Sequence, residues 1–222
     1  MNDATTARGC LITVEGIDGA GKSTQVEHLA AVLIAHGHRL VSTREPGATV
    51  LGRELRRLVL GRELALTADA ELFLFLADRA EHVATVIAPA LRAGAIVLCD
   101  RFSDSTIAYQ GYGRQGDLAR VRRWDAESRR GLEADLTLLL DCPIELGAER
   151  RHRETDRYQV LDRDFHGRVR QGFLDQAAAA PTRIHRIDGS RDLTMVSAEV
   201  ASLTLGWLAA HGFAPTTRPL SA

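Results

Sequence analysis

The sequence predicts an α/β fold with a five-stranded parallel sheet and helices on both faces. Five short apolar runs of strand length recur along the chain, at residues 10–14, 39–43, 95–100, 136–141 and 183–188. Segments in which apolar residues recur at helical spacing separate them. This alternation is typical of parallel strands joined by right-handed crossovers.

The composition is that of one globular domain, and we expect residues 1–222 to form it. Lysine and arginine together number 28 against 29 acidic residues, so no net field attracts the chain to nucleic acid or to an anionic membrane. The three cysteines lack metal-ligand spacing and are expected to be reduced structural thiols. No leader and no apolar run of membrane length is predicted, which favours a cytoplasmic protein, and residues 1–8 and 214–222 are expected to be loose termini.

The loop after the first predicted strand carries the strongest motif. Residues 16–23, Gly-Ile-Asp-Gly-Ala-Gly-Lys-Ser, fill every fixed position of the phosphate-loop pattern G-x-x-x-x-G-K-[ST]. Glycines let backbone N–H groups point at phosphate oxygens, Lys22 reaches the outer phosphates, and the Ser23 hydroxyl can bind Mg²⁺. The loop opens a helix predicted over 23–36, whose N-terminus favours an anion. A glycine-rich turn that fits the pattern by chance is the alternative, but the strand-loop-helix context favours a P-loop NTPase type of fold.

The third predicted strand ends in an acid, Asp100, which Arg101 follows directly. Because the carboxyl ends of parallel strands meet at one edge of a sheet, Asp100 is expected near the phosphate loop, where it could hold Mg²⁺. Arg101 would lie close by, where a cation can bridge two phosphates.

The loop of residues 44–49 follows the second predicted strand at the same edge, although the residues alone favour a plain Pro-Gly turn. A helix expected over 51–60 carries three arginines, which normally form a solvated face.

The next predicted helix, from about 67 to 88, places Arg79 inside an apolar stripe, one turn after Phe75. A buried guanidinium needs a partner, which could be Asp78, Glu81 or a ligand. Phe75 as plain core, with Arg79 reaching out to an acid, is an equally open interpretation.

Two later segments have open interpretations. Hydroxyl and amide side chains between residues 103 and 110 suit a base and a sugar, and a capped helix start explains them equally well. A polar helix expected over 117–131 shows no site signal. Residues 149–170 hold seven arginines and five acids, usually a solvated face, but their position after a central strand favours a short arginine-rich flap over about 149–162.

Several blocks of sequence, in their order along almost the whole chain, resemble bacterial thymidylate kinases of the nucleoside monophosphate kinase group. The resemblance rests on Glu-Gly-Ile-Asp-Gly-Ala-Gly-Lys-Ser-Thr at 15–24, Thr-Arg-Glu-Pro-Gly at 43–47, Ala-Asp-Arg-Ala-Glu-His at 77–82, Asp-Arg-Phe at 100–102 and Ala-Tyr-Gln-Gly-Tyr at 108–112. It implies transfer of the γ-phosphoryl group of ATP to dTMP, giving dTDP and ADP for dTTP synthesis, with Mg²⁺ and in a homodimer.

The resemblance also implies roles for individual residues. Phe75 would stack on thymine, Arg79 would donate to the base, and Tyr109 would lie against the deoxyribose. The implied ATP-binding residues are Gly16, Ile17, Asp18, Gly19, Ala20, Gly21, Lys22, Ser23, Thr24 and Arg150. The implied acceptor-binding residues are Glu45, Arg56, Phe75, Arg79, Arg101, Ser105, Thr106, Tyr109 and Gln110. Ser23 and Asp100 would hold the metal, and Lys22, Arg101, Asp18 and Arg157 would act in catalysis.

By the same resemblance, one phosphate-binding cation comes either from the glycine loop or from the flap. This loop offers no basic residue between Gly16 and Gly21, so the flap must supply it. Arg150, Arg153 and Arg157 are the candidates, with Arg157 favoured. Two departures bear on the flap assignments: Ala48 stands where a second glycine is usual, and Gln159 where an acid is common.

Two other functions stay open at this point. Another nucleoside monophosphate kinase, such as a UMP/CMP kinase, would use the same phosphate loop. A nucleotide-dependent switch protein is less favoured, because the guanine-reading Asn-Lys-x-Asp element is absent.

Overall fold

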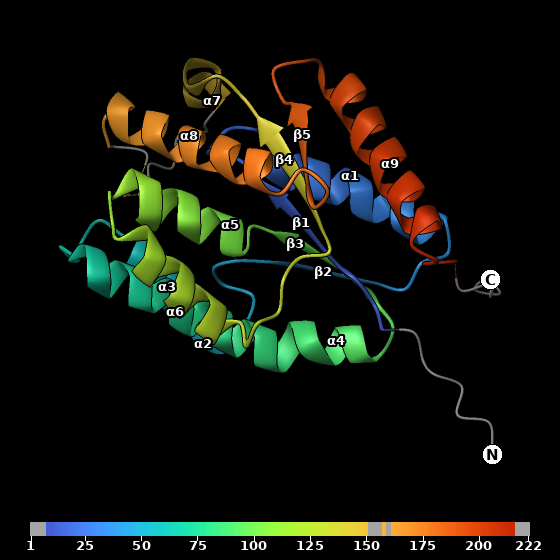
Figure 1. Cartoon of the computed structure of the whole chain (residues 1–222), viewed down its shortest axis with the longest axis horizontal. Helices are drawn as coiled ribbons and strands as arrows, with labels where there is room; N and C mark the ends of the chain where they lie inside the picture. The colour runs from blue at the N-terminus through green and yellow to red at the C-terminus, as the bar shows by residue number, and fades with distance from the viewer. Residues whose placement is uncertain (1–7, 151–156, 159–160, 216–222) are drawn as a thin grey trace.

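The computed structural model describes residues 8–150, 157–158 and 161–215. Its five strands form one parallel sheet in the order β2-β3-β1-β4-β5 (Figure 1). They are β1 (Leu11–Glu15), β2 (Leu40–Arg44), β3 (Ile96–Asp100), β4 (Leu136–Asp141) and β5 (Ile184–Asp188). The predicted α/β fold with a five-stranded parallel sheet is confirmed.

Burial explains why these runs form strands. All residues of β1 and β4 are buried, and β3 is buried up to its last residue, since helices cover both faces of the sheet. Successive side chains alternate between the faces: Leu11 and Val97 pack with the cluster around Val83, whereas Ile12 and Leu98 belong to the cluster of the opposite face.

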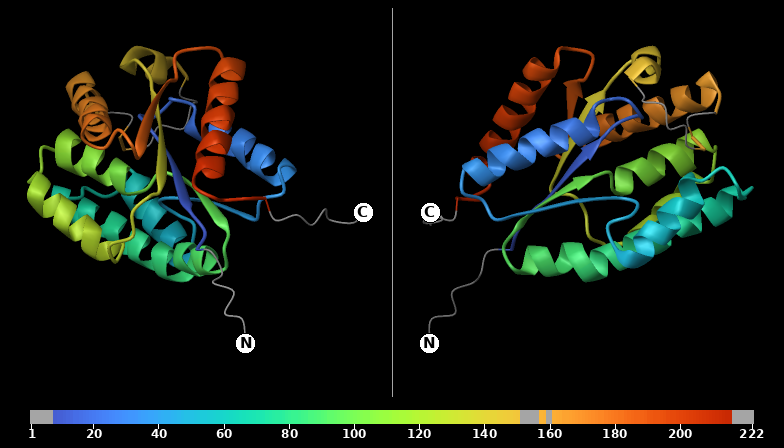
Figure 2. Two further views of the ribbon diagram at one scale, coloured as in Figure 1. Left: turned by 45° about the vertical axis from the view of Figure 1, so that its right-hand side comes forward. Right: turned by 180° about the vertical axis from the view of Figure 1, so that it is seen from behind.

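Two helices lie side by side on one face of the sheet, α1 (Lys22–Ala35) and α9 (Leu193–Ala210) (Figure 2). The other face carries a long helix in three parts, α3 (Ala68–His82), the π-helical segment η1 (Val83–Ile87) and α4 (Ala88–Arg92). The remaining helices are α2 (Val50–Leu60), α5 (Ser103–Thr106), the π-helix η2 (Ile107–Gly113), α6 (Leu118–Ser128), α7 (Ile144–Arg150) and α8 (Arg163–Ala179).

Helix α8 is absent from the expectations, which treated residues 149–170 as one charged run. The Asp162 side chain caps the helix by accepting from the Phe165 backbone N–H at 2.7 Å. Phe165, Val169 and Phe173 recur every four residues and are buried against the core. The arginines between them hid this pattern. Of the predicted flap, residues 151–156 and 159–160 lie outside the described residues.

Two further expectations, on the cysteines and on apolar runs of membrane length, can be compared with the structure. Cys10, Cys99 and Cys142 are free and buried, as predicted for structural thiols. In contrast, one described helix, α9, is long and apolar enough to cross a membrane by length and composition alone, so the expectation that no run approaches that length was wrong. Its buried stripe, Val196, Val200, Thr204 and Leu208, lies on a helix that packs against α1 and β5.

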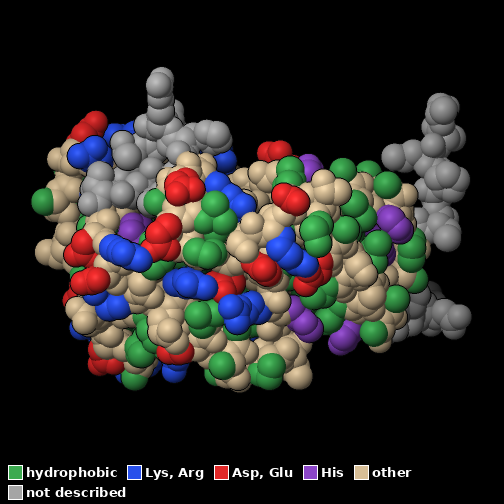
Figure 3. Space-filling model, turned by 90° about the horizontal axis from the view of Figure 1, so that it is seen from above, with side chains coloured by type: hydrophobic (Ala, Val, Ile, Leu, Met, Phe, Trp, Pro, Cys, Tyr) green, Lys and Arg blue, Asp and Glu red, His purple; other side chains and the backbone are tan. Residues whose placement is uncertain are grey.

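All five strands end at one rim of the sheet, and each ends in a charged residue: Glu15, Arg44, Asp100, Asp141 and Asp188. The arrowheads of β4 and β5 point to the top of Figure 1, and the view from above shows basic and acidic side chains intermingled on that face (Figure 3). Ligands of open parallel sheets bind at this rim.

Candidate active site

The glycine loop between β1 and α1 is shaped by three residues with left-handed backbone. Gly16, Gly19 and Gly21 have φ values of 141°, 83° and 93°. A Cβ on Gly19 would also lie 2.0 Å from the Gly147 carbonyl oxygen, so only glycine fits there. The loop borders a cavity of about 730 Å³ that Asp18 to Gln25, Asp100, Arg101 and Arg150 help to line.

Charged side chains of the loop are held close to its backbone. The Lys22 Nζ donates to the Ile17 carbonyl oxygen at 2.7 Å, and burial with the nearby Arg101 charge lowers the pKa of Lys22 to about 8. Burial opposes ionisation of Asp18, but Arg101 and Lys22 outweigh it and lower the pKa of Asp18 to about 2. The loop therefore presents both a cation and a carboxylate to the cavity.

The two residues predicted to bind a metal lie together. The Ser23 hydroxyl donates to Asp100 Oδ2 at 2.7 Å, and both residues line the cavity. No cluster of three or more His, Cys, Asp or Glu ligands occurs in the part of the chain that the structure describes. A hydroxyl with one carboxylate still fits Mg²⁺, which keeps several waters and takes its other ligands from substrate phosphates.

Arg101 directly follows β3 at the rim of the sheet. Its φ of 70° is left-handed, a strained backbone for a residue with a side chain and one that recurs at functional sites. Its guanidinium donates to the Gly16 carbonyl oxygen and to Ser105 Oγ, both at 3.0 Å, and pairs with Asp18. Although burial disfavours its charge, the neighbouring Tyr109 and Asp18 raise the pKa of Arg101 above the ordinary arginine value.

A second cavity, of about 100 Å³, opens beside Arg101. The π-helix η2 lies beside this cavity, and π-helical turns frequently occur at functional sites. Two consecutive η2 residues, Tyr109 and Gln110, both line this cavity. The other lining residues are Asp18, Glu45, Pro46, Arg56, Leu60, Phe75, Arg79, Arg101, Phe102, Ser105, Thr106 and Tyr158.

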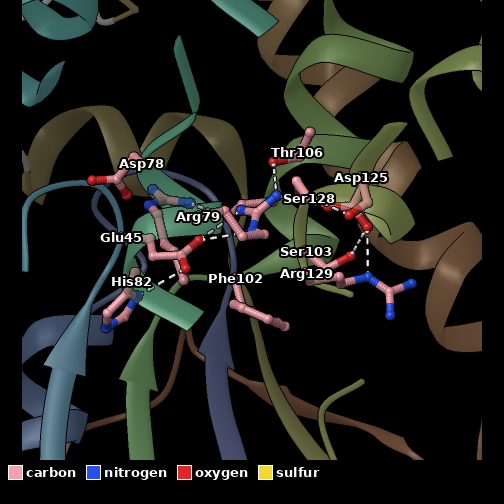
Figure 4. A network of polar contacts seen from close by, with 12 residues as sticks. Glu45, Asp78, Arg79, His82, Phe102, Ser103, Thr106, Asp125, Ser128 and Arg129 are labelled. Atoms are coloured by element: carbon pink, nitrogen blue, oxygen red, sulfur yellow. Dashed lines mark hydrogen bonds and ion pairs between the residues drawn. The ribbon is translucent and has the colours of Figure 1, made fainter. Parts of the chain in front are cut away.

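Arg79 lines this cavity from within a buried polar network (Figure 4). Its Nε donates to Glu45 Oε2 at 2.9 Å, and its Nη1 donates to Thr106 at 2.7 Å and to Asp125 Oδ1 at 2.6 Å. The guanidinium carbon lies 5.1 Å from the centroid of the Phe102 ring. Burial opposes the charge, but Glu45 and Asp125 raise the pKa of Arg79 above its ordinary value. A base entering the cavity would meet a guanidinium that is already fixed.

The side chains that pair with Arg79 are not the Asp78 or Glu81 that the sequence analysis named as possible partners. Neither Asp78 nor Glu81 pairs with it, because Asp78 Oδ1 instead accepts from the Gly47 N–H at 3.1 Å. Asp125 comes from α6, the polar helix that showed no site signal in the sequence. His82, in turn, holds Glu45 from behind, with 2.9 Å between Nδ1 and Oε1.

The loop 44–49 is more than the favoured Pro-Gly turn. Gly47 has a φ of 111°, and a Cβ there would lie 2.9 Å from Arg56 Cδ. The Arg56 Nη1 donates to the Pro46 carbonyl oxygen at 2.9 Å, so the loop fixes the arginine at the rim. Burial, and next the Glu45 charge, raise the pKa of Asp78 behind this loop to about 6.

Among the residues that the structure describes, four side chains line both cavities: Asp18, Glu45, Arg56 and Arg101. A ligand in the larger cavity and one in the smaller would therefore meet at two carboxylates and two arginines.

Most predicted residues lie at these cavities, with three described exceptions. Gly16 and Ile17 act through their carbonyl oxygens on Arg101 and Lys22. Arg157 lines neither cavity; its guanidinium donates to the Leu64 carbonyl oxygen and its N–H to Leu60 at 3.0 Å. Arg150 donates to the Gly189 carbonyl oxygen at 2.7 Å, and Arg153 lies outside the described residues.

Several lining residues escaped sequence reasoning. In the larger cavity these are Gln25, Arg44, Gly189, Arg191, Leu193 and Val196, and in the smaller Pro46, Leu60, Phe102 and Tyr158. Tyr158 had a usable signal, since it is an aromatic residue inside a charged run. Arg44, Pro46 and Phe102 stand within the motifs that carried the resemblance but received no role of their own. The others come from helices or from segments far along the chain.

Comparisons with known proteins agree with this geometry. Residues 14–200 match the family model of thymidylate kinase. A thymidylate kinase of Desulfovibrio desulfuricans is 52% identical over 190 residues, covering 81% of this chain and 88% of its own. One of Geobacter sulfurreducens is 43% identical over 206 residues, covering 89% and 97%. The crystal structure of a thymidylate kinase from Ehrlichia chaffeensis superposes with a TM-score of 0.74 at 35% identity, covering 89% of this chain and 99% of that one.

The phosphate loop, the second cavity beside it and these similarities over most of the chain lead to one conclusion. The chain belongs to the thymidylate kinase family.

Proposed function

We propose that this enzyme transfers the γ-phosphoryl group of ATP to dTMP, giving dTDP and ADP. The observation that carries the proposal is the meeting of two cavities at Asp18, Glu45, Arg56 and Arg101. A triphosphate over the glycine loop and a monophosphate held in the smaller cavity would face each other there, as in-line transfer requires.

On the donor side, the backbone N–H groups of residues 16–24 would hold the ATP phosphates, with Lys22 at the outer ones. Arg150 lies across the same cavity, beside Gly189, and would contact the nucleotide. Ser23 and Asp100 would hold Mg²⁺, which would neutralise charge on the phosphates.

On the acceptor side, Phe75 and Tyr109 would enclose the base and the deoxyribose, and Arg79, Ser105, Thr106 and Gln110 would surround the base. Arg56 and Arg101 would grip the acceptor phosphate. Asp18 pairs with Arg101, and the Pro46 carbonyl oxygen accepts from Arg56. A charged Arg101 would then stabilise the transferring group. Arg157, the favoured flap residue for that role, would have to leave its contacts with Leu60 and Leu64 to reach it.

The reaction needs no general base. The second pKa of a phosphate monoester is about 6, so the attacking oxygen of dTMP is already anionic at neutral pH. Catalysis then consists of alignment and of positive charge held in place, which the buried arginines supply.

We also propose that the chain acts as a homodimer of single-domain subunits in the cytoplasm, with the exposed side of α3 as its contact surface. Phe73 on α3 is 50% exposed and its ring lies 4.8 Å from that of Trp124 on α6. Light scattering of wild type and Phe73→Glu measures the oligomeric state, and a monomeric wild type would contradict this part.

The deciding experiment is a substrate panel. ADP formation is followed with ATP, Mg²⁺ and each of dTMP, dUMP, UMP, CMP and AMP. We expect the highest kcat/KM with dTMP and a loss of turnover with EDTA. A preference for UMP or CMP would indicate another monophosphate kinase, and ATP hydrolysis without any acceptor would indicate a switch protein.

A further inference from the structure

A carboxylate that the proposed reaction does not use lies behind the acceptor cavity. Glu71 of α3 is 1% exposed. Its Oε2 accepts from Arg114 Nη2 at 2.8 Å and its Oε1 from Arg114 Nε at 3.2 Å. In this two-point ion pair with a guanidinium, both Glu71 oxygens accept hydrogen bonds.

Glu71 contacts the cavity through Gln110. The Gln110 Nε2 donates to Glu71 Oε1 at 3.0 Å and to the Tyr158 hydroxyl oxygen at 3.2 Å. The Tyr158 hydroxyl is itself hydrogen-bonded to Glu71, which leaves its oxygen lone pair for Gln110. Both amide hydrogens of Gln110 are therefore committed.

The other end of the amide faces a different way. Gln110 is 4% exposed and lines the cavity, and no donor to its Oε1 occurs among residues 8–150, 157–158 and 161–215. Rotating the amide by half a turn would place a carbonyl oxygen against the buried Glu71 carboxylate, which is repulsive in a dry site. The orientation follows from the acceptor-only chemistry of Glu71.

We propose that Glu71 is a positioning residue that fixes the Gln110 amide with its carbonyl oxygen toward the base, and thereby selects pyrimidines that carry an N3–H. Thymine and uracil present a donor at N3 and a carbonyl oxygen at C4, which match the oxygen of Gln110 and the donors of Arg79. Cytosine presents the opposite pattern at both positions. This inference rests on the proposed function and explains how its base is chosen.

The test compares two substitutions that separate acceptor chemistry from size. Glu71→Gln keeps the length but can donate as well as accept, so the Gln110 amide can reverse. Glu71→Asp is shorter but still only accepts. We expect the ratio of kcat/KM for dTMP to that for dCMP to fall about 10- to 100-fold in Glu71→Gln, and to stay near the wild-type value in Glu71→Asp even where both rates fall.

Two further variants complete the design. Asp69→Asn on the same helix removes an exposed ion pair with Arg120 and is expected to change neither rate nor ratio. Arg114→Met removes the guanidinium that pairs with Glu71 at two points and holds its orientation, and is expected to lower the ratio as Glu71→Gln does. It serves as the test where Glu71→Gln does not fold by circular dichroism. A wild-type ratio in folded Glu71→Gln or in folded Arg114→Met overturns the inference, as does an equal fall in Glu71→Gln and Glu71→Asp. Lack of any dTMP activity in the wild type would instead contradict the proposed function.

Discussion

The donor loop and the acceptor cavity are built by different means. The donor loop is one continuous stretch, Gly16 to Ser23, whose backbone forms the site and whose glycines permit its turns. The acceptor cavity is lined by side chains from α2, α3, η2 and other segments far apart in the sequence, and behind it a network of buried charges joins Glu45, Arg79 and Asp125. Backbone makes the first site, and paired side chains make the second.

This difference has a physical consequence. A backbone site loses function when a side chain intrudes, whereas a network of buried charges loses stability when one partner is removed. Substitutions at the two sites are therefore expected to change different measured quantities.

Asp125→Ala is expected to have the largest effect, on stability. Asp125 is 1% exposed and accepts from both Arg79 and Arg129, so its loss removes one of the two buried carboxylates that pair with Arg79. We expect the free energy of unfolding to fall by about 3–5 kcal/mol, measured by urea denaturation. Asp69→Ala, which removes an exposed pair, is the control and should stay within about 1 kcal/mol of wild type. Equal small losses in both would show that the network adds little.

Arg101→Ala tests the junction that the two sites share. We expect kcat to fall about 10²- to 10³-fold, because a fixed positive charge is lost where phosphoryl charge develops. The unfolding midpoint should change little, since the partner Asp18 can turn to solvent. Arg62→Ala, at an exposed arginine, is the matched control. Wild-type turnover in Arg101→Ala would remove Arg101 from the mechanism.

Asp78→Asn tests whether the Asp78 carboxylate, buried behind the loop 44–49, destabilises the fold when it is ionised. The pKa of Asp78 is about 6, above its ordinary 3.8, so the folded state binds this proton more tightly than the unfolded state. The stability contribution is therefore present below pH 3.8 and is lost as the pH rises through 6. We expect Asp78→Asn to be more stable than wild type by roughly 1–3 kcal/mol at pH 8, with the gap closing at pH 4. Thermal melts at both values measure it, and an unchanged gap would contradict the assignment.

Phe75→Ala is expected to have the smallest effect and to be confined to the acceptor. We expect KM for dTMP to rise about tenfold through the loss of base stacking, while KM for ATP stays the same. The two sites would then be independent in binding. Equal increases in KM for both substrates would mean that the two cavities are coupled in binding.

The sequence predicted the donor loop more completely than the side-chain network of the acceptor cavity, because the residues of the loop are contiguous. The donor loop could be predicted because its glycines, Lys22 and Ser23 lie next to one another and need only a strand before them and a helix after them. The strand ends at Asp100 and Arg101 were placed correctly by the parallel topology alone. Strand periodicity and parallel topology therefore sufficed to predict which residues lie at the rim of the sheet.

The side-chain network could not be predicted in the same way. Arg79 stood out as a charge in an apolar stripe, but its partner Asp125 lies 46 positions later on a helix with no distinctive pattern. Glu71 and Arg114 are 43 positions apart and meet only because α3 packs near η2. Helix α8 escaped because arginines interrupt its apolar residues. Pairing across such distances depends on packing, which no short stretch of sequence records.

The π-helical geometry of η2 also constrains how this chain can change length. A π-helical turn is in effect an α-helix with one residue inserted, and that extra residue lets Tyr109 and Gln110 share one cavity. Deleting a single residue between Ile107 and Gly113 would convert this turn to ordinary α-helical winding, in which neighbouring side chains lie about 100° apart around the helix axis. A substitution in this segment changes one side chain, whereas a deletion would change the direction of Tyr109 relative to Gln110 and so affect both cavity side chains at once.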